Sequence, residues 1–222
     1  MTSWLAFACV FALFFVTHSV PVRPPVKRRL VAHLGPRGFT LAYALLSLVM
    51  LALLIWATQR APFVSLWAEA PWHRPVIWLG MFAACVIFAV AIGRPNPFSF
   101  GGSNNDAFNP SAPGVVAYLR HPLLSAMALW AILHMVMNGD LAHVLLFGTL
   151  AFFAIMGHRI VDKRKKRVLG PENWAQLWAK TRKGRRLSLP SRGFIIRACI
   201  GGGVYILLVV LHPIVIGLPV FL

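Results

Sequence analysis

Apolar residues occur along this chain in six long runs, which are separated by shorter polar or basic stretches. The runs cover residues 4–21, 39–58, 75–92, 121–137, 141–158 and 195–211. Each holds about 17–20 residues, close to what a helix rising about 1.5 Å per residue needs to cross a hydrocarbon core about 30 Å thick. The pattern therefore predicts an all-α fold, a polytopic membrane helix bundle with about six transmembrane helices.

The composition of the chain supports a membrane class. Of its 222 residues, 59% are hydrophobic and only five are acidic, a balance more apolar than a soluble domain needs. The three cysteines are isolated, so neither a thiolate metal cluster nor covalent haem attachment is predicted. Because there is no repeat and no long polar linker, we expect residues 1–222 to form a single domain that includes a basic cytoplasmic segment, 159–197.

The formal net charge of +17 would suit a nucleic-acid partner, but the positions of the charges indicate membrane topology instead. Segments 22–38, 93–120 and 159–197 hold five, two and thirteen of the 22 basic residues, which leaves Arg60 and Arg74 for the opposite side. Cytoplasmic loops of membrane proteins are enriched in Lys and Arg. We therefore expect a multi-pass protein of the bacterial inner membrane, with both termini periplasmic, the lipid bilayer as its partner and no nucleic acid bound.

Two of the basic connections differ in character. Residues 93–114 are rich in Gly, Pro, Asn and Ser, which predicts an irregular cytoplasmic loop. In the last connection, Trp174, Leu177 and Trp178 recur at i, i+3 and i+4 beside cationic residues. This spacing predicts a short helix in the headgroup layer, with its indoles at the interface and its cations on anionic lipid headgroups at the cytoplasmic face. A solvated basic loop is the alternative.

Two histidines lie inside predicted spans, where ionisable groups are costly and therefore often functional. His18 shares a helix face with four phenylalanines, and His134 shares one with two methionines and a tryptophan. These neighbours are Phe7, Phe11, Phe14 and Phe15 for His18, and Met127, Trp130 and Met137 for His134. Together the two faces could hold haem b, for which neutral imidazole is a common axial ligand. The alternative is that each imidazole bonds to a neighbouring helix within ordinary packing.

Axial ligands of one iron must lie at similar depth in the membrane. Along ideal helices, His18 lies about 8 Å from the basic edge at Arg23, and His134 about 21 Å from Arg120. The pairing therefore requires the first helix to continue past Pro21, or Arg120 to lie within the protein. We assign no role to the histidines near span ends or in loops, His33, His73, His143 and His212.

The sequence Arg120-His121-Pro122 precedes the span that carries His134. Proline is well suited to the first turn of a helix, and the free N–H groups there favour an anion, so Arg120 and His121 could bind a phosphate or carboxylate. Equally, this basic helix start could simply mark the membrane boundary. At the other end of the same span, Asn138-Gly139-Asp140 predicts a tight turn, with Asp140 capping the next helix.

Three stretches carry a resemblance to a known family. HSVPVRPPVKRRL at 18–30, RHPLLSAMALWAILHMVMNGDLAHVLLFG at 120–148 and HRIVDKRKKRVLG at 158–170 resemble the NnrU family of bacterial membrane proteins, over most of the chain from His18 to about Arg186. That family is similar in turn to zeta-carotene isomerase, a multi-spanning protein that carries haem b. Matched to it, the histidine ligands fall on His18 and His134, whereas Ala131 replaces a cysteine proposed there as an alternative ligand.

The resemblance implies a haem b-binding membrane protein with a redox, nitric-oxide or denitrification-linked role, or an isomerase-like one. His18 and His134 would ligate the iron, Arg120 and His121 would neutralise the haem propionates, and a membrane redox partner would exchange electrons. A more distant similarity, to isoprenylcysteine and phospholipid methyltransferases, implies S-adenosylmethionine as the alternative cofactor. The acidic pair of those enzymes is reduced here to Asp162, followed by Lys163 and Arg164. A non-catalytic membrane assembly factor is the third alternative.

Overall fold

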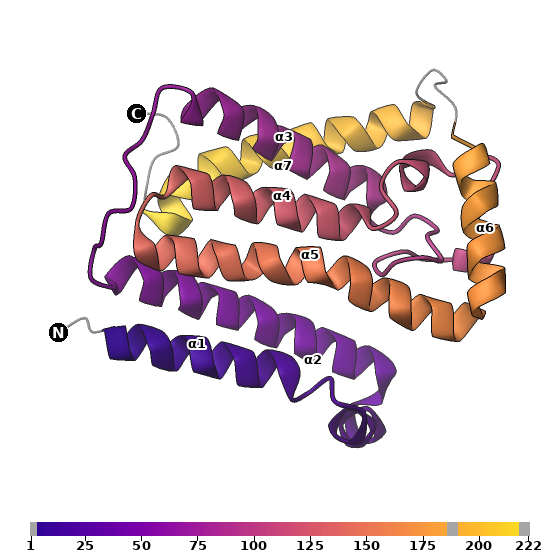
Figure 1. Ribbon diagram of the computed structural model, residues 1–222, viewed down its shortest axis with the longest axis horizontal. Helices are drawn as coiled ribbons and strands as arrows, with labels where there is room; N and C mark the ends of the chain where they lie inside the picture. Colours follow the sequence, from indigo (N-terminus) through magenta and orange to yellow (C-terminus); the bar gives the residue numbers. More distant parts are fainter. Residues whose placement is uncertain (1–3, 186–190, 218–222) are drawn as a thin grey trace. The chain divides into compact units, whose positions relative to one another are not determined.

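The computed structural model describes residues 4–185 and 191–217, and within these ranges the chain is helical with no β-strand (Figure 1). The seven α-helices and two short 3-10 helices are α1 Trp4–Ser19, α2 Pro24–Arg60, α3 His73–Ala91, η1 Asn105–Ala107, η2 Gly114–Ala117, α4 Pro122–Met137, α5 Leu141–Leu169, α6 Pro171–Lys183 and α7 Arg192–Ile216. The all-α prediction is confirmed.

The chain divides into two compact units. Unit 1 contains α1, α2 and residues 138–146, and unit 2 contains residues 69–137 and the chain from 147 onward. Within unit 2, α3, α4, α7 and the greater part of α5 run side by side, and α6 crosses the end of α5 (Figure 1). That residues 1–222 behave as one domain stays a prediction.

Four helices, α2, α3, α5 and α7, are long and apolar enough to cross a membrane. The apolar helices α1 and α4 have 16 residues each, which gives about 24 Å along the axis, short of a complete hydrocarbon core. All six predicted runs therefore lie mainly on helices, and within the described residues α2, α3, α5 and α7 reach spanning length. Many aliphatic side chains of α7 are exposed, as a lipid-facing helix requires. The protein is an all-α membrane protein in contact with lipid.

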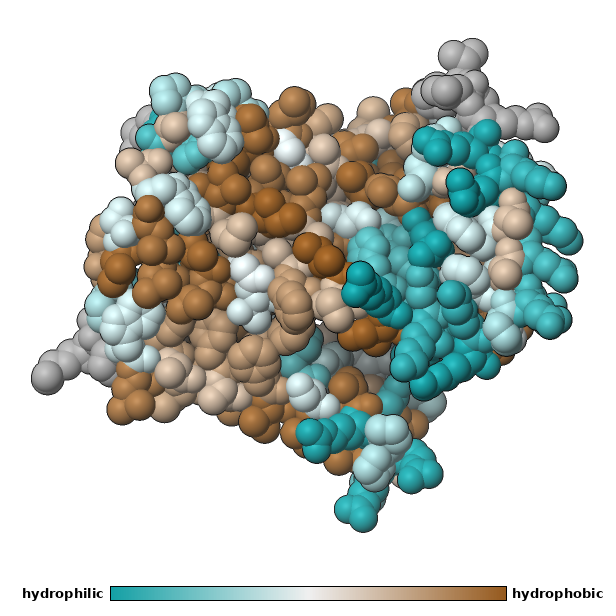
Figure 2. Space-filling model, viewed as in Figure 1, coloured by the Kyte–Doolittle hydropathy of each residue, from teal (hydrophilic) through white to brown (hydrophobic). Residues whose placement is uncertain are grey.

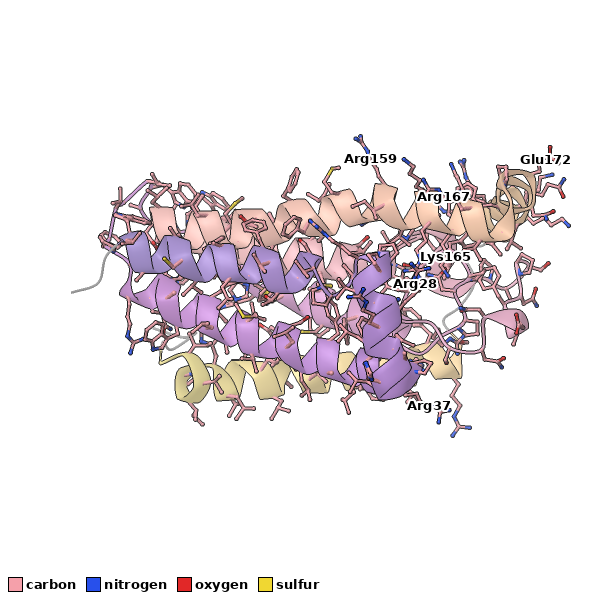
Figure 3. The ribbon with its side chains drawn as sticks, turned by 90° about the horizontal axis from the view of Figure 1, so that it is seen from below. Arg28, Arg37, Arg159, Lys165, Arg167 and Glu172 are labelled. Atoms are coloured by element: carbon pink, nitrogen blue, oxygen red, sulfur yellow. The ribbon has the colours of Figure 1, made fainter. Side chains whose placement is uncertain are left out.

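Two helices, α2 and α5, continue beyond their predicted apolar runs into segments that contain charged residues. Helix α2 already begins at Pro24, and it breaks at Gly35, whose φ of 69° lies in the left-handed region and which precedes Pro36. In Figure 1 the part before this break is seen end-on, across the direction of the part after it. Helix α5 continues past the predicted end at 158 to Leu169, and its Arg159 and Arg167 point away from the ribbon (Figure 3).

Helix α6 confirms the predicted short helix in the last connection, but its tryptophan face packs on the protein. Trp174 is only 7% exposed and forms a hydrophobic cluster with Phe98 and Val116. The opposite face is basic, and hydrophilic residues dominate the surface around α6 (Figure 2). The Trp174 indole therefore lies in the core of unit 2, and not among lipid headgroups as the sequence predicted.

Close backbone approaches require glycine at several places, and Gly139 in unit 1 and Gly201 in unit 2 are two of them. In unit 1 the Gly139 carbonyl accepts the N–H groups of Leu66 and Trp67 at 2.7 and 3.1 Å, and a Cβ on Gly139 would lie 2.1 Å from the Trp67 carbonyl oxygen. In unit 2 a Cβ on Gly201 of α7 would lie 2.8 Å from the Cα of Val86 on α3.

The predicted cap of α5 is confirmed. The Asp140 carboxylate accepts the backbone N–H of His143 at 3.3 Å, which satisfies a donor in the first turn of the helix. The same carboxylate lies 2.6 Å from Nδ1 of the His143 ring. His143, to which the sequence assigned no role, therefore belongs to this cap.

Candidate functional site

A group of polar side chains lies at the start of α4 in unit 2, and we call it the Arg120 cluster. Its members are Ser99, Arg120, His121, His158 and Asp162. The Arg120 guanidinium donates to one oxygen of the Asp162 carboxylate, and the other oxygen lies 3.0 Å from His121 Nε2. His121 Nδ1 lies 3.1 Å from the Ser99 hydroxyl oxygen. His121 is only 1% exposed, and both nitrogens of its ring have a partner within the protein.

Asn96, in the loop between α3 and α4, holds the backbone of this cluster. Its side-chain amide donates to the Arg120 carbonyl at 3.0 Å, and its side-chain oxygen accepts the Phe98 N–H at 3.0 Å. Its own N–H donates to the side-chain oxygen of Asn105 at 2.8 Å. The predicted irregular loop is confirmed, and these bonds explain how Asn96, Phe98 and Ser99 can be buried within it.

Aromatic rings of α6 cover the guanidinium of the cluster. Arg120 lies 5.2 Å from the Trp174 ring centroid and 4.8 Å from that of Trp178, and Lys166 lies 4.4 Å from the Trp174 centroid. These distances are typical of cation–π contacts. The indole N–H of Trp174 is the one buried side-chain polar atom without a hydrogen-bond partner in the part of the chain that the structure describes.

Ser99 and His158 are the members of the cluster that the sequence did not single out, and Asp162 was named only for the methyltransferase alternative. His158 and Asp162 stand four residues apart on α5 and therefore on one face of the helix. The rings of His158 and His121 meet edge to face, with their centroids 5.0 Å apart. A histidine followed at i+4 by the one acid within a run of cations was a usable signal.

The Ser99–His121–Asp162 chain has the residue types of a nucleophilic triad, but its setting suits another task. Ser99 is only 2% exposed, so no substrate reaches its hydroxyl. Burial lowers the pKa of His121 more than the nearby Asp162 charge raises it, which favours the neutral ring. A neutral imidazole between a hydroxyl and a carboxylate fixes the loop to α5 and can pass a proton between them.

Arg120 and His121, the predicted anion-binding pair, thus lie together and share the Asp162 carboxylate. The charges of Arg120 and Asp162 therefore balance each other inside the protein. Asp162 is the acid that the methyltransferase alternative needs for its cofactor. That Arg120 and His121 bind haem propionates stays a prediction.

His134 lies near the end of α4, within unit 2. Its Nδ1 lies 2.9 Å from the Trp130 carbonyl oxygen, and because a carbonyl only accepts, Nδ1 carries the hydrogen. The ring stacks on Phe147 of α5 at a centroid distance of 4.7 Å and lies 4.8 Å from the Trp130 ring. In the neutral imidazole this bond leaves the lone pair on Nε2, the arrangement that metal-ligating histidines commonly have.

His18 lies at the end of α1, within unit 1. Its ring stacks on Phe14 at 5.0 Å and lies 5.5 Å from the ring of Tyr43 on α2, whose hydroxyl donates to the His18 carbonyl at 2.9 Å. The predicted aromatic face is confirmed for Phe7 and Phe14, which are buried, whereas Phe15 is exposed. Because His18 and His134 belong to different units, their pairing stays a prediction. Within residues 4–185 and 191–217, no group of three or more His, Cys, Asp or Glu side chains is arranged so that it could hold a metal ion.

Comparison with known proteins identifies a family. A family model described as "NnrU protein" matches residues 6–220, which is nearly the whole chain. The searches of curated proteins and of solved structures give no match. The chain belongs to the NnrU family.

Proposed function

We propose that this member of the NnrU family binds haem b within the bacterial inner membrane, with His134 and His18 as axial ligands, in a redox or nitric-oxide-linked role. Membership of the family is compatible with a membrane protein linked to nitric oxide or denitrification. Bound haem b would supply a one-electron redox centre, which makes a membrane redox partner part of the proposal.

The single observation that carries the proposal is the setting of His134. The hydrogen bond from Nδ1 to the Trp130 carbonyl orients the ring and directs its lone pair to Nε2, which a haem iron requires of a ligand. The rings of Trp130 and Phe147 restrict its rotation and exclude water from its sides.

The residues around His18 are also suited to a haem ligand. Phe14 and Tyr43 give its ring flat apolar surroundings, and the bond from the Tyr43 hydroxyl to its carbonyl fixes the end of α1. Rings of this kind suit the faces of a porphyrin. The proposal requires the two imidazoles to reach one iron from opposite sides.

The test is an absorption spectrum, oxidised and reduced, of detergent-purified protein expressed with sufficient haem. We expect a sharp reduced α-band in the wild type, and its loss or conversion to a high-spin spectrum in both His18→Ala and His134→Ala. His33→Ala, at an exposed position on α2, is the matched control and should keep the wild-type spectrum. Added imidazole should restore a low-spin spectrum to the two ligand variants.

A colourless wild type that cannot be reconstituted with haem would overturn the proposal. Calorimetric titration with S-adenosylmethionine would then test the methyltransferase alternative, which the engagement of Asp162 with Arg120 and His121 disfavours. A stable partner that co-purifies with cofactor-free protein would instead favour an assembly factor.

A further inference from the structure

Unit 2 carries an apolar groove that shares the side chain of Trp130 with the surroundings of His134. The groove has a volume of about 790 Å³ and is formed by α3, α4 and α7. On α3 it is lined by small side chains such as Ala84 and Ala89, and on α4 and α7 by larger ones such as Trp130 and Ile200. Its volume falls in the range of small-molecule sites, about 300–1,000 Å³.

One end of this groove is cationic. Arg197 of α7 lines it, and its Nη1 donates to the carbonyls of Ala89 and Ile92 at 3.2 and 2.7 Å, which caps the end of α3. A guanidinium has five N–H donors, so these two bonds leave donors for a further partner. No carboxylate among the described residues pairs with Arg197.

The remainder of the groove is apolar. Away from Arg197 its lining continues along α7 through Val204 to Leu208, and the exposed aliphatic side chains of this helix face the lipid. A ligand complementary to this surface has one anionic end and a long hydrocarbon tail. Arginine binds phosphate through several charge-assisted hydrogen bonds, which are stronger than those between neutral groups.

We propose that this groove is a binding site for an anionic phospholipid taken from the surrounding bilayer. The phosphate binds Arg197, and one acyl chain lies between α4 and α7 over the small side chains of α3. Because Arg197 also caps α3, the bound lipid ties the end of α3 to the start of α7 at the basic end of unit 2.

Gly193 offers a way to test the site without removing the Arg197 cap. It lines the groove one helical turn before Arg197, and a Cβ built on it meets no atom within 4 Å. Gly193→Glu would place a carboxylate beside Arg197, where it competes with the phosphate. Gly193→Gln has almost the same size and shape but no charge, which makes it the matched control.

The experiment is native mass spectrometry of the delipidated full-length protein in detergent, titrated with phosphatidylglycerol or with phosphatidylcholine of the same acyl chains. We expect the wild type and Gly193→Gln to bind phosphatidylglycerol about tenfold more tightly than phosphatidylcholine, an effect typical of one charge-assisted contact. Gly193→Glu should lose this preference.

Thermal melting in the presence of each lipid gives a second readout. Phosphatidylglycerol should raise the melting temperature of the wild type and of Gly193→Gln but not that of Gly193→Glu. Equal affinity of the wild type for both lipids would overturn the proposal, since the site would then not distinguish an anionic headgroup from a zwitterionic one. An unchanged preference in a folded Gly193→Glu protein would also overturn it, because the phosphate would then bind elsewhere.

Discussion

The two ends of α4 each carry a histidine, and their environments differ. At the start, His121 is held by Ser99 and Asp162, and Asp162 is held in turn by Arg120. Near the end, His134 lies among aromatic rings and bonds through Nδ1 to a backbone carbonyl of its own helix. The first arrangement holds a buried ring between a hydroxyl and a carboxylate, whereas the second orients a ring among aromatic side chains through a backbone carbonyl of its own helix. Substitutions at the two ends should therefore differ in what they damage.

The largest effect on stability should come from the start of α4. Asp162→Asn removes the charge that balances Arg120 and changes the partner of the buried His121 ring. Because Arg120 and Asp162 are themselves partly exposed, we expect a loss of about 1–3 kcal/mol. Thermal and denaturant unfolding of the detergent-solubilised protein measures this. Asp106→Asn, at an exposed position in η1, is the control and should change stability by less than about 0.5 kcal/mol. Equal stability of the two variants would show that the Arg120 cluster contributes little to the fold.

A smaller effect, mainly on ligand binding, should come from the other end. Phe147→Leu keeps an apolar side chain but removes the ring stacked on His134, and aromatic pairs contribute about 0.5–1.5 kcal/mol beyond their area. We expect haem affinity to fall by up to about tenfold, measured by haem titration and the reduced absorption spectrum. Phe152→Leu, on the same helix but exposed, should leave the spectrum and the affinity unchanged. If both variants bind haem equally, Phe147 does not position His134.

The smallest effect should appear with pH. The pKa of His121 in the folded protein lies below the value of 6.5 of a free side chain, because burial disfavours its charged form. Below pH 6.5 the unfolded chain therefore binds a proton more readily than the folded one, and stability falls as the pH decreases. Melting curves between pH 7.5 and 5.5 should show this loss, and His121→Asn should flatten it. A stability that rises toward pH 5.5 would mean that the Asp162 charge dominates instead.

Hydrophobic runs predicted the positions of the helices but not their lengths. For α3 and α4 the apolar run and the helix nearly coincide, because both helices end at glycine- or turn-rich segments. Helices α2 and α5 extend into basic segments, since Lys and Arg are good helix formers that a count of apolar residues ignores. Helix formation and membrane burial are separate properties of a sequence.

The candidate site was predictable only where its residues follow a local pattern. His134 and Trp130 share a helix face, and the motif at Arg120 and His121 marks a helix start, so both attracted attention in the sequence. Ser99 lies in an irregular loop, and Asp162 is 42 residues from Arg120. Contacts between residues so far apart in the sequence depend on how α5 packs beside the loop, and the periodic pattern of apolar residues does not predict that packing.

The triplet Gly201-Gly202-Gly203 on α7 has a consequence for natural variation. A side chain at Gly201 would collide with the backbone of α3, one at Gly202 would only touch the Phe82 ring at 3.5 Å, and one at Gly203 would meet nothing. These three adjacent glycines should therefore differ in how often they are substituted in related proteins. Gly201 should remain glycine, Gly202 should accept alanine, and Gly203 should accept any apolar residue that is compatible with lipid.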